Sequence, residues 1–123
     1  MQKQRADRGA RAWQAGAAAE GSVERLYERG GRQIVARRWR GQGGEIDLVA
    51  RDGAEIIFIE VKQSATHAQA AEHLGPRQMA RICTAASEYL AQEPLGQLTP
   101  VRFDVALVDG AGRIEILENA FAA

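Results

Sequence analysis

Residues 44–62 constrain the fold of this chain more than any other stretch. Two short runs rich in β-branched residues, 46–50 and 55–61, flank the dipeptide Asp52-Gly53. Runs of this kind form strands, and Asp-Gly between two of them strongly favours a tight turn. The stretch therefore predicts a β-hairpin.

The length of the turn decides which side chains of this hairpin share a face. With a two-residue loop at Asp52-Gly53, Asp47 faces Phe58 and Glu45 faces Glu60. A four-residue loop over residues 51–54 keeps this register, whereas a three-residue loop would put the carboxylates on opposite faces. Because strands alternate with period two, one side is expected to carry Glu45, Asp47, Phe58, Glu60 and Lys62. The other side is apolar and is expected to face the core: Ile46, Leu48, Ala50, Ile57, Ile59 and Val61.

Asp47, Glu60 and Lys62 are the candidate catalytic residues. In the expected register the two acids are diagonal neighbours with Cα atoms about 7–8 Å apart, which lets both carboxylates contact one ion. Clustered carboxylates repel one another, and Mg²⁺ commonly binds one or two carboxylates together with waters and phosphate oxygens. Lys62 points the same way and could orient a water or neutralise charge on a phosphate. The alternative is that all three are ordinary solvent-facing side chains with a weak Glu60–Lys62 ion pair.

The composition indicates one globular domain over residues 1–123, with residues 1–10 as a flexible N-terminus. Hydrophobic residues make up 46% and charged residues 26%, a balance typical of a folded domain. The single cysteine, Cys83, cannot form an internal disulfide and lies in a helical apolar stripe. The first residues lack a signal-peptide core and no run has the length of a membrane span, so we expect a cytoplasmic protein that does not enter a membrane. His67 and His73 have no third ligand nearby, so no zinc site is predicted.

The net charge of zero conceals an asymmetry along the chain. Residues 1–40 contain ten Lys and Arg against four Asp and Glu, whereas residues 41–123 contain six against twelve. A basic segment followed by an acidic one fits phosphate attraction in the first part and cation binding in the second. The same charges also fit a solvated surface that keeps the domain soluble.

Periodicity and turn residues predict alternating helices and strands elsewhere in the chain. We expect helices over about 11–28 and 76–92 and strands over 33–40, 101–108 and 113–117. The glycine-rich residues 41–44 are expected to form a flexible connector. The polar, alanine-rich residues 63–73 fit either a helix or a loop. Phe121 is expected to pack on the core.

Glu20 lies on the apolar stripe of the first expected helix. That stripe also carries Trp13, Gly16, Val23 and Tyr27. A carboxylate on such a stripe is costly to bury without a partner. Glu20 is therefore expected either at the edge of the buried face or beside a cation.

The order of these elements and their motifs resembles the PD-(D/E)xK nuclease superfamily, which has the restriction-endonuclease-like fold. Within it the chain is similar to the YraN family of uncharacterised bacterial proteins, often described as endonuclease-like. The residues that carry the resemblance are Gly16-x-x-Ala-Glu20, Ala36-Arg-Arg-Trp-Arg40, Gly44-Glu-Ile-Asp-Leu48, Phe58-Ile-Glu-Val-Lys62, Arg102-Phe-Asp-Val105 and Asn119-Ala-Phe121. They span nearly the whole chain after residue 10.

The resemblance implies an α/β fold in which helices flank a central mixed β-sheet, with the element order α-β-β-β-α-β-β. It implies a Mg²⁺ or Mn²⁺ site formed by Asp47 and Glu60, to which the first-helix Glu20 is added. Lys62 takes the position of the motif lysine. The chain departs from the family pattern at Ser64 and Gln78, where basic residues are usual, and at Arg38, where asparagine is common.

The function expected from these residues is metal-dependent hydrolysis of phosphodiester bonds in DNA, including branched DNA. Contacts to the nucleic-acid backbone are expected from Arg37, Arg38, Arg40 and Arg77. One alternative is a non-catalytic nucleic-acid-binding module of the same fold, whose binding would depend strongly on salt. Another is an interaction domain, in which two copies form a homodimer through an exposed sheet edge.

Overall fold

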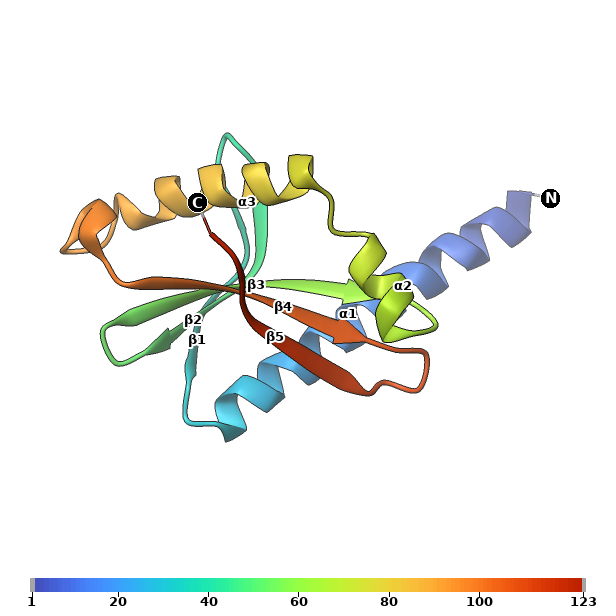
Figure 1. The fold of residues 1–123 in the computed structure, drawn as a ribbon. Helices are drawn as coiled ribbons and strands as arrows, with labels where there is room; N and C mark the ends of the chain where they lie inside the picture. The colour runs from blue at the N-terminus through green and yellow to red at the C-terminus, as the bar shows by residue number, and fades with distance from the viewer. Residues whose placement is uncertain (1, 123) are drawn as a thin grey trace.

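The computed structural model describes the backbone of residues 2–122 and the side chains of residues 16–122. A five-stranded sheet occupies the centre, with α1 on one face and α3 on the other (Figure 1). The elements are α1 (Gln2–Arg29), β1 (Gln33–Arg40), β2 (Glu45–Asp52), β3 (Glu55–Gln63), α2 (His67–Glu72), α3 (Pro76–Leu90), the 3-10 helix η1 (Gly96–Leu98), β4 (Val101–Val108) and β5 (Ile114–Phe121). The predicted α/β fold with a central mixed sheet is confirmed. Within the described residues, none of the helices has the length and apolar character needed to cross a membrane.

The sheet has the strand order β1-β2-β3-β4-β5 and is mixed. Only β3 and β4 pair in parallel, whereas the other neighbours are antiparallel. A parallel pair needs a long crossover connection, and the segment with α2, α3 and η1 provides it. Strands β3 and β4 are buried along most of their length because helices cover both of their faces.

Helix α1 covers one face of the sheet through a stripe of residues four apart. Ala19, Val23 and Tyr27 are buried on this stripe. They pack against Leu48, Ala50, Ile57, Ile59, Ala106 and Val108. The helix begins at Gln2 rather than near Arg11, and the flexibility of residues 1–10 stays a prediction. The side chain of Trp13, predicted on the same stripe, lies outside the described residues.

Helix α3 covers the opposite face with a core rich in aromatic rings. Its buried residues Ile82, Ala85, Ala86 and Leu90 pack over Ile46, Val49, Ile56, Phe58 and Phe103. The rings of Phe58 and Phe103 stack with centroids 5.4 Å apart, and Phe121 stacks on Phe103 at 5.0 Å. The predicted packing of Phe121 on the core is confirmed. Offset-stacked rings at these distances add to the energy of burial.

The register of the β2–β3 hairpin differs from the predicted one by two residues. Asp52 pairs with Glu55 and Leu48 with Ile59, so the two loop residues are Gly53 and Ala54. Gly53 has a φ of 61°, and glycine with positive φ at the first loop position is the pattern of a type II′ turn. The predicted pairing of Asp47 with Phe58 is therefore wrong. Continuing the observed ladder by one step places Asp47 level with Glu60, and an even shift leaves both on one face.

The alternation predicted for β2 breaks at Asp47. Leu48 packs with α1, but Ile46, predicted on the same face, packs with α3. In the pairing with β1, Ile46 is opposite Trp39 and Leu48 is opposite Arg37. Arg38 between them has a φ of 48°, a left-handed conformation that side chains other than glycine seldom adopt. This local distortion of the strand pair accounts for the change of face.

Candidate functional site

A pocket of about 260 Å³ lies where the start of β2, the end of β3 and the start of α3 meet. Its lining consists of Gly44, Glu45, Asp47, Glu60, Gln78, Arg81 and Ile82. Lys62 Nζ lies 3.3 Å from Glu60 Oε1. The structure thus brings the three predicted catalytic residues together, and their chemical roles stay predictions.

Hydrogen bonds hold both carboxylates of the pocket in defined orientations. Asp47 Oδ2 accepts a hydrogen bond of 2.8 Å from the backbone N–H of Val61. Glu60 is only 5% exposed, and its Oε1 accepts a hydrogen bond of 2.9 Å from Gln78 Nε2. Asp47 and Glu60 also lie close enough to share a hydrogen bond when one of them carries a proton. A proton or a cation between them would therefore satisfy both carboxylates.

The two carboxylates are strongly coupled. Burial raises the pKa of Glu60, the neighbouring charge of Asp47 raises it further, and Lys62 partly opposes both, with a net pKa of about 8. Burial also raises the pKa of Asp47, against the lowering effect of the Val61 hydrogen bond. A buried and a half-buried acid in contact resist double ionisation unless a proton or a cation lies between them. Near neutral pH the pair therefore holds a proton or requires a cation.

Glu20, the third predicted metal ligand, is bonded to an arginine. Its carboxylate lies 3.1 Å from Arg38 Nε. Burial raises the pKa of Glu20 and Arg38 opposes this, while the charges of Asp47 and Glu45 also raise the pKa. Of the two expected positions for Glu20, the structure has the one beside a cation. No group of three His, Cys, Asp or Glu in the described part of the chain is arranged to hold a metal ion, so Glu20 as a ligand stays a prediction.

The arginines of β1 are each joined to a glutamate. Arg37 bonds to Glu24, Arg38 to Glu20, and Arg40 Nη2 lies 3.1 Å from Glu45 Oε2. Arg77, by contrast, is exposed near the start of α3. Three of the four arginines predicted to contact nucleic acid are thus partly neutralised, and their role stays a prediction.

Sequence reasoning missed two residues of the pocket, Gln78 and Arg81. Gln78 was noted only as a departure from the family pattern, yet it bonds directly to Glu60. Arg81 lies three residues later, on the neighbouring helical turn, and lines the same pocket. This spacing was visible in the sequence. Which side of α3 faces the hairpin, however, depends on how the helix docks on the sheet.

Comparison with known proteins agrees with the resemblance noted from the motifs. A family model described as "Uncharacterised protein family UPF0102" matches residues 19–108. The chain belongs to the UPF0102 family. It is 71% identical over 109 residues to a UPF0102 protein of Cereibacter sphaeroides, covering 89% of this chain and 93% of that protein. It is 66% identical over 116 residues to one of Ruegeria pomeroyi, covering 94% of each, and 44% identical over 119 residues to one of Dinoroseobacter shibae, covering 97% and 89%.

The coupled carboxylates predict how the stability of this UPF0102 protein depends on pH. The pKa of Glu60 is about 4.5 in the unfolded chain and about 8 in the folded protein, so the folded protein binds a proton more tightly. The free energy of unfolding is therefore highest below pH 4.5 and falls as the pH rises toward 8. In EDTA, we expect the free energy of unfolding to fall by about 1–3 kcal/mol between pH 5 and 8. Glu60→Gln should remove most of this fall, as measured by urea unfolding at both values.

The matched control for that measurement is Glu72→Gln, because Glu72 is an exposed carboxylate on α2. It should leave the pH dependence of the wild type unchanged. If the free energy of unfolding changed equally with pH in the wild type and in Glu60→Gln, Glu60 would ionise in the folded protein as it does in the unfolded chain.

The connector of residues 41–44 is packed against α3, although the sequence predicted a flexible segment. The carboxylate of Glu88 accepts backbone N–H hydrogen bonds from Gln42 at 2.6 Å and Gly43 at 2.8 Å. At Gly44, an added Cβ would lie 3.1 Å from the carbonyl oxygen of Arg81. The glycines thus permit close approach to the helix. In this UPF0102 protein the connector forms a wall of the pocket.

Gly43→Ala is expected to destabilise the protein by about 1–3 kcal/mol, because overpacking forces neighbours to shift. An added Cβ at Gly43 would overlap Thr84 Cγ2. Thr84→Ser removes that methyl group, so the double variant should recover at least half of the loss in chemical denaturation. Gly16→Ala is the control with the opposite sign. An added Cβ there meets nothing within 4 Å, and alanine should stabilise the helix by about 0.5–1 kcal/mol.

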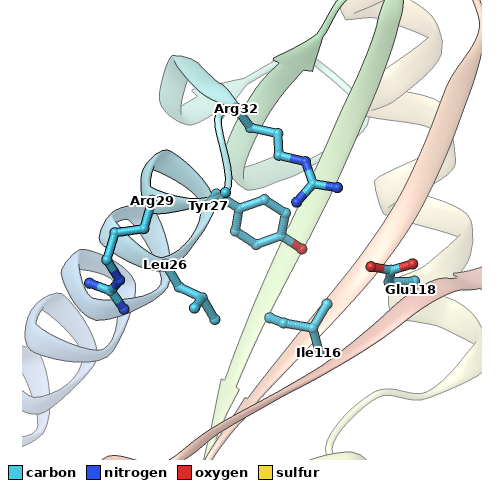
Figure 2. Close-up of a pocket in the computed structure, with 7 residues that line it drawn as sticks. Leu26, Tyr27, Arg29, Arg32, Ile116 and Glu118 are labelled. Carbon is cyan, nitrogen blue, oxygen red and sulfur yellow. The ribbon is translucent and has the colours of Figure 1, made fainter.

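A larger pocket, of about 400 Å³, lies near the C-terminal end of α1 (Figure 2). Leu26, Tyr27 and Ile116 form its apolar part, while Arg32 and Glu118 lie at its edge. Its lining contains one carboxylate rather than a coupled pair. The chemistry of the side chains, and not pocket volume, therefore identifies the candidate site of this UPF0102 protein.

Proposed function

We propose that this protein is a divalent-metal-dependent endonuclease that hydrolyses phosphodiester bonds of DNA. The observation that supports this proposal most is that one pocket brings together the buried Glu60 carboxylate, the half-buried Asp47 carboxylate and the Lys62 ammonium. Burial raises the pKa of both acids, the charge of Asp47 raises the pKa of Glu60 further, and Lys62 Nζ lies 3.3 Å from Glu60 Oε1. The PD-(D/E)xK resemblance implies the same acid, acid and lysine set.

The donor set of the pocket fits Mg²⁺ or Mn²⁺. Mg²⁺ is commonly held by one or two carboxylates with water and phosphate oxygens, and the carboxylates of Asp47 and Glu60 line the pocket next to one another. Glu20 would join them if its bond to Arg38 opened. When bound, such an ion polarises a phosphoryl oxygen and lowers the pKa of a bound water.

The protein's own groups would orient the reactants. The Val61 N–H fixes the Asp47 carboxylate, and Gln78 with Lys62 fixes Glu60, so neither acid needs to reorganise on binding. The Lys62 ammonium can orient a water molecule or neutralise charge that develops on the phosphate. Such preorganised charge in a partly dry pocket stabilises the transition state strongly.

The decisive experiment incubates purified protein with linear, nicked and four-way DNA in Mg²⁺ or Mn²⁺. We expect cleavage by the wild type and by Asp52→Asn, which changes an exposed acid on the same strand. Asp47→Asn should abolish it. The ion should also stabilise the wild type, by about 1.4 kcal/mol at ten times its Kd, but not Asp47→Asn.

Three results would contradict the proposal. Absence of cleavage on every substrate would exclude the nuclease, and equal cleavage by Asp47→Asn would place the chemistry elsewhere. A third result would support the non-catalytic binding module instead: the protein cleaves no DNA, and its salt-dependent binding of DNA is the same in the wild type and in Asp47→Asn.

A further inference from the structure

The exposed side of α3 beside the pocket carries positive charge and no acid. The exposed residues of α3 are Pro76, Arg77, Ala80, Arg81, Thr84 and Ser87. The helix contains one acidic residue, Glu88, and the carboxylate of Glu88 is held by the N–H groups of the connector. A polyanion approaching this side would therefore meet two guanidinium groups among small neutral side chains.

Arg81 links this side of α3 to the candidate site. It lines the pocket together with Asp47 and Glu60, and it is the basic residue among the lining residues. Its backbone is fixed, because Gly44 of the connector packs against it. Among residues 16–122, neither Arg77 nor Arg81 has an acidic group within 4.0 Å that would form an ion pair. Both guanidinium groups are available to an external anion.

The arginines of β1, unlike Arg77 and Arg81, form ion pairs with other described residues of the protein. Arg37, Arg38 and Arg40 each bond to a glutamate, so binding a phosphate would require breaking that contact or sharing the guanidinium. Each glutamate would also repel a phosphate placed beside its arginine. The charge balance of this strand therefore disfavours it as the main contact to a polyanion, although the sequence predicted such a contact.

We propose that α3 is the surface that binds the phosphodiester backbone of DNA, and that Arg81 contacts the phosphate held next to Asp47 and Glu60. This inference rests on the proposed function for the identity of the polyanion. Guanidinium groups suit this role because they stay charged and form two parallel hydrogen bonds to phosphate. Arg77, one helical turn away and about 6 Å along the axis, contacts a neighbouring part of the backbone.

The binding test uses a short fluorescent DNA duplex in EDTA, so that it does not depend on cleavage. Arg81→Ala and Arg77→Ala should each weaken binding about 3–10-fold at moderate salt and lower the slope of log K against log salt by about one. Arg113→Ala is the control, because Arg113 is exposed on the β4–β5 turn, outside the pocket lining. The affinity of Arg113→Ala for the duplex should lie within about twofold of the wild-type affinity. Thermal unfolding of each variant should match the wild type, because all three side chains are exposed.

A cleavage assay separates the two arginines of α3. Arg81→Ala should lower kcat by about 10-fold or more, because it contacts the reacting phosphate, and Arg81→Lys should restore part of it. Arg77→Ala should raise KM with little effect on kcat.

The outcomes distinguish this inference from the proposed function. If Arg81→Ala behaves like Arg113→Ala while Arg37→Ala or Arg40→Ala lowers the salt slope, the binding surface is β1 and the inference is overturned. Weakened binding by Arg81→Ala in a protein that cleaves no DNA would support the α3 surface and reject the endonuclease. A wild type that binds no DNA even at low salt would overturn both.

Discussion

Asp104→Ala is expected to lower the free energy of unfolding by about 3–5 kcal/mol, because it removes the buried acceptor of three hydrogen-bond donors, one of them a guanidinium group. Asp104 is 1% exposed on β4. Its carboxylate accepts hydrogen bonds from Tyr27 Oη at 2.6 Å, Arg102 Nε at 2.8 Å and the backbone N–H of Asn119 at 2.9 Å. Burial and the Asp104 contact raise the pKa of Tyr27, so its hydroxyl stays a donor. Removal of the carboxylate leaves all these donors without an acceptor. Urea unfolding measures the decrease in the free energy of unfolding.

Glu55→Ala is the matched control for Asp104→Ala. Glu55 lies 3.6 Å from the same arginine, Arg102, but its side chain is 37% exposed. Exposed ion pairs contribute little, so the cost should be below about 1 kcal/mol. Tyr27→Phe, which removes one donor and keeps the ring, should cost about 1–2 kcal/mol. Similar losses for Asp104→Ala and Glu55→Ala would show that the network does not stabilise the fold.

Lys62→Met is expected to reduce DNA cleavage by about 10²–10³-fold, the usual effect of removing one preorganised group that stabilises transition-state charge. The side chain of Lys62 is 16% exposed and its ammonium lies beside Glu60, so methionine fills the space without the charge. Because the two carboxylates are untouched, the stabilisation by Mg²⁺ should persist. Single-turnover cleavage and thermal unfolding with and without Mg²⁺ measure the two effects separately.

Gln63→Met is the control, because Gln63 is the next residue of β3 and is exposed. It should cleave DNA at the wild-type rate. If Lys62→Met cleaves as well as Gln63→Met, then Lys62 serves only as an ion-pair partner of Glu60. If Lys62→Met loses the Mg²⁺ effect too, the lysine instead supports the carboxylates.

The clustering of Asp47 and Glu60 was predictable even though the register was wrong. Side chains alternate along a strand, so any turn that shifts the pairing by two residues leaves the same residues on one face. The turn began one residue later than predicted because Gly53, and not Asp52, takes the first loop position. The predicted face of a side chain was wrong at Ile46, which pairs with Trp39 next to the left-handed Arg38.

The hydrogen bonds between distant elements were not predictable in the same way. Gln78 and Glu88 lie on α3, and each bonds to a segment far from it in the chain. Arg102 and Asp104 lie on β4, and Tyr27 donates a hydrogen bond to Asp104 from α1, 77 residues away in the chain. Local patterns show which residues share a face of one element. Local patterns do not show which helix or strand packs against that face.

The sequence alone determined most helices and strands, their apolar faces except at Ile46, and the common face of Asp47, Glu60 and Lys62. Each follows from periodicity and turn chemistry, which act over a few neighbouring residues. The α/β class was implied by the family resemblance of the motifs. The tertiary structure alone decided that Arg38 bonds to Glu20, that Gln78 bonds to Glu60, and that Arg81 lies at the pocket with no ion pair to another described residue. These contacts depend on how helices dock on the sheet, and docking is set by packing of the whole core rather than by any local stretch.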